Sequence, residues 1–85
     1  MLLSDLKKVL KYFNISDEDS VSIQIVGGSS SDCINVYNGD NFVFAFFENA
    51  TFNFINGALT SVPTIMFTKN GELETIALND ILKAV

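Results

Sequence analysis

Carboxylates are the main chemically active side chains of this 85-residue sequence, which has ten Asp and Glu, five Lys, one Cys and no His. Without His, the chain lacks the commonest general base and the commonest metal ligand. Cys33 has no neighbouring cation in sequence that would favour a thiolate, so we expect a buried, inert thiol. Nothing in the sequence places two carboxylates around a pocket, as paired-carboxylate catalysis requires. We therefore predict a protein that is not an enzyme and that holds no cofactor or metal.

Two short segments resemble ligand-binding loops without meeting the requirements of such loops. Residues 27–31 read Gly-Gly-Ser-Ser-Ser, but a phosphate-binding loop is followed by a helix N-terminus, and here a strand is predicted. Asp17, Glu18 and Asp19 carry suitable oxygens for a cation, but a calcium loop needs ligands at alternating positions and a turning Gly. We interpret the first segment as a loop and the second as a solvated acidic connection.

The formal net charge is −5, and Arg is absent. A protein that binds nucleic acid directly needs a basic surface, and an anionic membrane surface would repel this chain. No apolar run reaches the roughly 18 residues that span a bilayer, and the first residues lack the order of a signal peptide. The single Cys favours a reducing compartment. We expect a cytoplasmic protein whose partner offers a basic surface, with no direct contact to nucleic acid or membrane.

The stretch around which the chain must fold is residues 42–47, Phe-Val-Phe-Ala-Phe-Phe. Side chains of a strand alternate between two faces, so Phe42, Phe44 and Phe46 are expected on one face and the residues between them on the other. A strand that is apolar on both faces belongs inside a sheet that is covered on both sides. What covers the second side is the question that leads to function.

Helical periodicity predicts an N-terminal helix over residues 4–13, capped by Ser4 and ended by Asn14 in a left-handed conformation. A short C-terminal helix is predicted over residues 80–85 with Asn79 as its N-cap. Between them, alternating apolar residues predict about six short antiparallel strands connected as a meander. The expected fold is therefore a single α+β domain over residues 1–85.

Turn signals set the expected pairing of the strands. Three hairpin loops are predicted: Asn38-Gly39, Asn56-Gly57 and Lys69-Asn70-Gly71. The second loop places Phe54 opposite Leu59, and the third, with three residues, places Phe67 opposite Leu73. Residues 48–50 are expected to turn the chain as well, and Pro63 suits an edge or a bulge between strands.

These pairings assign the side chains to two faces. The first face is expected to form the core under the N-terminal helix and includes Leu73. The second face is expected to have an apolar centre: Val26, Cys33, Tyr37, Val43, Ala45, Phe47, Ile55, Met66 and Ile76. Its polar rim includes Glu72 and Glu74. Three interpretations remain open for it: closure by the C-terminal helix and sheet curvature, burial in a symmetric dimer, or docking of a partner protein.

Function is therefore expected to lie in recognition between surfaces. The residues expected at the protein interface are Asp17, Glu18, Asp19, Tyr37, Phe47, Glu48, Glu72 and Glu74. The leading hypothesis is a small acidic inhibitor that blocks a basic surface of a host nucleic-acid-handling protein. Enrichment in Phe, Ile, Asn and Lys is typical of AT-rich genomes and favours a phage or mobile-element origin. The alternatives are a homo-oligomeric structural protein and a small-ligand binder with a Phe-lined pocket.

Overall fold

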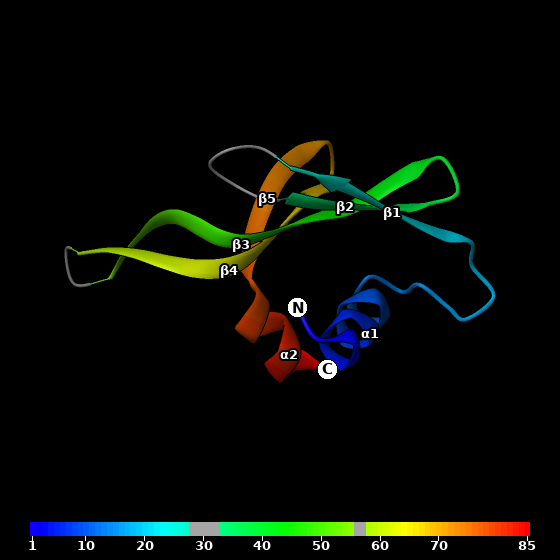
Figure 1. The fold of residues 1–85 in the computed structure, drawn as a ribbon, viewed down its shortest axis with the longest axis horizontal. Coiled ribbons are helices and arrows are strands. Elements are labelled where there is room, and N and C mark those ends of the chain that lie inside the picture. Colours follow the sequence, from blue (N-terminus) through cyan, green and yellow to red (C-terminus); the bar gives the residue numbers. More distant parts are fainter. Residues whose placement is uncertain (28–32, 56–57) are drawn as a thin grey trace.

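Five strands form one antiparallel sheet, and two helices lie on the same side of it (Figure 1). These elements come from a computed structural model that describes residues 1–27, 33–55 and 58–85, with the backbone alone for 49–61 within those ranges. In chain order the elements are α1 (Leu3–Tyr12), β1 (Val21–Val26), β2 (Cys33–Asn38), β3 (Asn41–Ile55), β4 (Ala58–Lys69), β5 (Glu72–Ala77) and α2 (Leu78–Ala84). The strand order is β1-β2-β3-β4-β5, so the expected α+β meander is confirmed, with five strands rather than about six.

The strand count is lower because residues 48–50 do not turn the chain. The register shifts after Phe47, which pairs with Thr64, while Ala50 pairs with Val62. Two residues of β3 therefore face only Pro63, and this irregularity is a bulge of the kind where a missing backbone N–H is tolerated. Past the bulge, β3 and β4 continue as a two-stranded arm that extends beyond the other strands (Figure 1).

Helix α1 is stopped by Asn14 as predicted, but its expected N-cap is wrong. Leu2 rather than Ser4 occupies the N-cap position, and it makes no side-chain capping hydrogen bond. At the other end, Asn14 has a φ of 60°, as expected for a left-handed stop. The N–H of Ile15 donates to the carbonyl of Leu10 at 2.9 Å, which closes the helix by folding the chain back over its last turn.

Helix α2 packs on the first face of the sheet, together with α1. It begins at Leu78, because β5 runs directly into it with Ala77 as the N-cap, so the expected capping by Asn79 is wrong. Leu78 and Ile81 are buried in the same core as Val9 of α1. The interpretation that the C-terminal helix closes the second face is therefore wrong.

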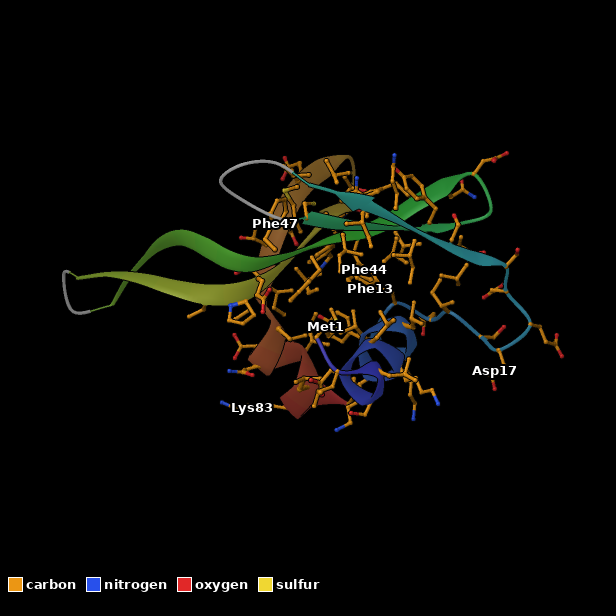
Figure 2. The ribbon with its side chains drawn as sticks, in the orientation of Figure 1. Met1, Phe13, Asp17, Phe44, Phe47 and Lys83 are labelled. Carbon is orange, nitrogen blue, oxygen red and sulfur yellow. The ribbon has the colours of Figure 1, made fainter. Side chains whose placement is uncertain are left out.

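The core lies between the sheet and the two helices. Phe44 of β3 is fully buried, and the ring of Phe13 from α1 stacks on it with 5.2 Å between centroids. Phe13 also meets the edge of Phe67 of β4 at 5.3 Å. Figure 2 shows Phe13 and Phe44 facing each other between helix and sheet. Burying large aromatic side chains in this way supplies much of the favourable free energy of a small domain.

A bulge in β3 moves Phe42 away from the face where the alternation places it. Val36 pairs with Phe44, but the next residue of β2, Tyr37, pairs with Phe42, so Val43 has no opposite residue. Consequently Val43 packs against the core, and Phe42 lies beside Tyr37 on the second face with 38% of its surface exposed. The expectation that Phe42 shares the core face with Phe44 is wrong.

The turn between β4 and β5 is one residue shorter than expected. Asn70 and Gly71 have φ values of 54° and 80°, and Lys69 pairs directly with Glu72, so the loop has two residues. A shift of one residue moves every side chain of a strand to the other face. The faces of β5 are accordingly exchanged: Leu73 lies on the second face, and Glu72, Glu74 and Ile76 lie on the first.

The other two hairpins agree more closely with expectation. Phe54 pairs with Leu59, which confirms the register set by the Asn56-Gly57 loop, although residues 56–57 themselves lie outside the described residues. The loop between β2 and β3 consists of Gly39 and Asp40, one residue further on than expected. The Gly-Ser loop expected at residues 27–31 is described only at its first residue.

Neither of the two described helices is long and apolar enough to cross a membrane.

The opposite placement of Phe42 and Phe44 predicts opposite effects on stability. Phe44→Ala removes a buried ring and should lower the free energy of unfolding by about 3–5 kcal/mol. Phe42→Ala removes a ring at the surface and should lower it by about 1 kcal/mol or less. Urea denaturation followed by circular dichroism measures both values. Equal losses for the two variants would contradict the bulge at Val43.

Candidate functional site

The second face of the sheet is the first candidate surface, because no described helix packs on it. Phe47 and Met66 are half-buried near its centre, and Ala45 is almost fully buried between them and the neighbouring strands. Leu73 on β5 is 64% exposed. Polar side chains of the outer strands, including Ser22 of β1, surround this centre. An apolar surface with a polar rim is typical of a protein interaction site.

One end of this face carries a pair of aromatic rings. Tyr37 and Phe42 meet edge to face with 5.8 Å between centroids, and both are partly exposed. The Tyr37 hydroxyl donates a hydrogen bond to Oε1 of Gln24 at 3.5 Å. The loop that joins the two rings contains the exposed carboxylate of Asp40. Rigid aromatic side chains beside a carboxylate suit the recognition of Arg or Lys, through both ring stacking and charge.

More carboxylates lie at the same end of the sheet, in the connection between α1 and β1. The N–H of Gly39 donates to the carbonyl of Ser20 at 2.9 Å, which ties this connection to the β2–β3 loop. Within the connection, the carboxylate of Asp19 accepts the N–H of Ser16 at 2.8 Å and closes a single turn. The side chains of residues 17–19 are exposed, and Asp17 projects away from the core (Figure 2). We call residues 17–19, Asp40 and the Tyr37–Phe42 pair the aromatic–acidic end.

The structure divides the expected interface residues between two ends of the sheet. Tyr37 joins the aromatic–acidic end, together with Asp17, Glu18 and Asp19. Phe47 is at the opposite end, because it pairs with Cys33, the first residue of β2, whereas Tyr37 is near the last. Glu48 follows Phe47 and is exposed there. The expected set therefore does not form one continuous surface.

Glu72 and Glu74 lie at the start of β5, on the side of the sheet that carries the helices. Glu74 lines a shallow hollow with Tyr12 of α1 and Phe67 of β4. Their expected position on the rim of the second face is therefore wrong, because the two-residue turn at Asn70 exchanges the faces of β5.

A second candidate surface is an apolar groove on the first face, between the start of α1 and the strands. Its volume is about 220 Å³, and Leu2, Leu3 and Ile23 form its open side. The remaining lining residues are also apolar: Met1, Leu6, Ile34, Val36, Phe44 and Phe46. Pockets for small organic ligands usually enclose about 300–1,000 Å³, so this groove is small for that purpose.

The described Asp, Glu and Cys side chains are the ones that could bind a metal ion. No three of these described side chains come together as metal ligands would. Burial raises the pKa of the Cys33 thiol above its ordinary value, which disfavours the reactive thiolate. The Cys33 thiol donates to Oδ1 of Asn35 at 3.4 Å and has no described base as its partner. The described surroundings of Cys33 therefore disfavour its use as a nucleophile.

Phe42 and Asp40 were not among the residues expected at the interface. Phe42 fits the alternation of a regular strand, and the bulge that turns it outward depends on pairing with β2. Asp40 is one of several isolated acids, and only the contact between Gly39 and Ser20 brings it to the acidic connection. The local signal that was available is the Gly39-Asp40 turn, which predicts exposure of Asp40.

Comparison of the chain with protein-family models, curated proteins and solved structures found no match.

The environment of Cys33 predicts that its thiol is alkylated slowly and that the rate reaches its plateau only at a higher pH than for an ordinary thiol. Because burial raises the pKa of this thiol, its reaction with iodoacetamide should be severalfold slower in the native protein than in the denatured protein. The native rate should still be rising at pH values where the denatured rate has levelled off. Mass spectrometry of samples quenched over time gives both curves. Coincident curves would contradict the burial of the thiol.

Proposed function

We propose that this chain is a non-enzymatic protein-binding domain that blocks a basic surface of another protein through its aromatic–acidic end. The observation that carries the proposal is the partly exposed Tyr37–Phe42 ring pair beside the exposed carboxylates of residues 17–19 and Asp40. The rings supply apolar contact area, and the carboxylates supply attraction for Arg and Lys. Binding through rings and carboxylates involves no chemical reaction.

The distribution of charge supports this assignment. Three of the five lysines, Lys7, Lys8 and Lys11, lie on α1, and Lys83 lies on α2, so most of the positive charge is on the helical side. The exposed acids of residues 17–19 and Asp40 gather at one end of the sheet. Opposite charges across an interface increase the rate of association and disfavour incorrect partners. A basic partner would therefore approach this end first.

Inhibition is the function that best fits a small domain of this kind. Occupying a basic surface with carboxylates and rings prevents that surface from contacting the phosphates of a nucleic acid. The proposed target is accordingly a nucleic-acid-handling protein of the host, and the proposed source is a phage or another mobile element, as the composition suggests. The modest acid content favours a local block of one site over imitation of a whole DNA duplex.

Two pairs of neutralising substitutions test the site while keeping the net charge equal. Glu18→Gln with Asp40→Asn removes two charges at the aromatic–acidic end, and Glu48→Gln with Asp80→Asn removes two charges elsewhere. The first pair should weaken binding of a basic partner severalfold, because charge-assisted contacts are lost, and the second should change it little.

The measurement is capture from a nuclease-treated bacterial lysate on the immobilised protein at low and high salt, followed by mass spectrometry. Basic proteins retained at low salt and released at high salt support the proposal if the first pair of substitutions reduces their recovery. Retention of no basic protein at low salt would contradict it. Equal recovery with both pairs would show that net charge, and not this site, attracts the partner.

A further inference from the structure

The two edge strands of the sheet differ in charge. Strand β5 carries Glu72 and Glu74, and charged residues on an edge strand prevent pairing with other chains. Strand β1, Val-Ser-Ile-Gln-Ile-Val over six residues, carries no charge and no Pro. It pairs with β2 on one side, and no described strand pairs with its other side. As far as the described residues go, the edge of β1 is therefore open to pairing with another strand, whereas that of β5 carries charges.

Large apolar side chains are exposed beside this edge. Val21 packs against the core, but the helices do not extend over the rest of β1, so Ile23 and Ile25 are 50% and 75% exposed. Leu2 and Leu3, at the start of α1, are 69% and 67% exposed. Leu2, Leu3 and Ile23 line the same groove. The unpaired edge and the apolar surface thus form one continuous area on the first face.

We propose that this area binds a second copy of the chain, with β1 pairing antiparallel to β1 of the other copy about a two-fold axis at Gln24. In this register Gln24 lies opposite its own equivalent, and Ile23 of each copy lies opposite Ile25 of the other. All four isoleucines then share the first face, and the leucines of the two α1 helices approach them from the same side. The two sheets become one continuous sheet.

The charges of the chain favour antiparallel over parallel pairing of two copies. Each copy has a net charge of −5, so self-association requires a contact that keeps the carboxylates apart. Strand β1 contributes none of those charges. Residues 17–19 and Asp40 lie near its first residue, Val21, and antiparallel pairing places the first residues at opposite ends of the contact. Parallel pairing would bring the two acidic ends together.

The amide of Gln24 suits a two-fold axis. An amide side chain carries both donors and an acceptor, so two equivalent glutamines can hydrogen-bond to each other. Oε1 of Gln24 accepts from Tyr37 within one copy, and its N–H₂ group remains able to donate across the axis. An isologous contact of this kind uses the same surface on both copies and closes at the dimer. The proposed assembly is therefore limited to two copies.

The first test compares Ile25→Lys with Leu73→Lys. Both residues are exposed leucine or isoleucine side chains on edge strands, at 75% and 64%, but only Ile25 lies in the proposed contact. The wild-type protein should be a concentration-dependent dimer by analytical ultracentrifugation. Ile25→Lys should weaken the dimer about tenfold or more, because a buried charge has no partner there, and Leu73→Lys should leave it unchanged. Circular dichroism confirms that both variants are folded.

The second test fixes the register. In a Cys33→Ala background, Gln24→Cys places two thiols opposite each other across the axis, at a Cα separation of about 4.5–5.5 Å that a disulfide can bridge. Oxidation should convert this variant to a covalent dimer, and Thr75→Cys on β5 should stay monomeric. A wild-type protein that is monomeric at millimolar concentration would overturn the proposal. A dimer that survives Ile25→Lys, or that Thr75→Cys cross-links as well as Gln24→Cys does, would also overturn it.

Discussion

The packing of Phe13 on Phe44 and Phe67 decides which side of the sheet the helices cover. These rings join α1 to the two central strands with 5.2 and 5.3 Å between centroids, and Ile81 of α2 is buried in the same core. Helices of ten and seven residues cannot extend over all five strands. Once both are placed on one side, no described helix covers the second face or most of β1. The candidate surfaces of this protein follow from that constraint.

Two backbone irregularities determine what the exposed surfaces present. The bulge at Val43 turns Phe42 outward to meet Tyr37, and the short turn at Asn70 turns Leu73 outward. Each shift exchanges one apolar side chain of the core for another, because Val43 and Ile76 pack against the core while Phe42 and Leu73 face away from the helices. The exchanges leave the side chains of Phe42 and Leu73 at the surface, 38% and 64% exposed.

Local signals in the sequence were sufficient for part of this structure. The central position of the aromatic strand, the helix stop at Asn14 and the pairing of Phe54 with Leu59 each depend on a few neighbouring residues, and all three were predicted correctly. The merging of short strands into β3 and β4 was not predictable in this way. Pro63 interrupts a regular strand, and the bulge that accommodates it here is set by the pairing of β3 with β4. The face of the sheet on which Phe42 and Leu73 lie depends on the register with a neighbouring strand. The acidic connection was recognised as a candidate, but its position beside Tyr37 required the contact between Ser20 and Gly39.

The two proposed contacts use different parts of the molecule. Pairing through β1 would occupy its edge and the groove on the first face, whereas Tyr37 and Phe42 lie on the second face, where the hydrogen bond from Tyr37 to Gln24 links the two contacts. Antiparallel pairing would also direct the two acidic ends apart. A dimer would therefore present two copies of the aromatic–acidic end, facing opposite ends of one sheet. For a target with two basic surfaces, such as a symmetric nucleic-acid-binding dimer, engaging the first would raise the effective concentration at the second. Self-association could thus strengthen inhibition without adding any contact to the site itself.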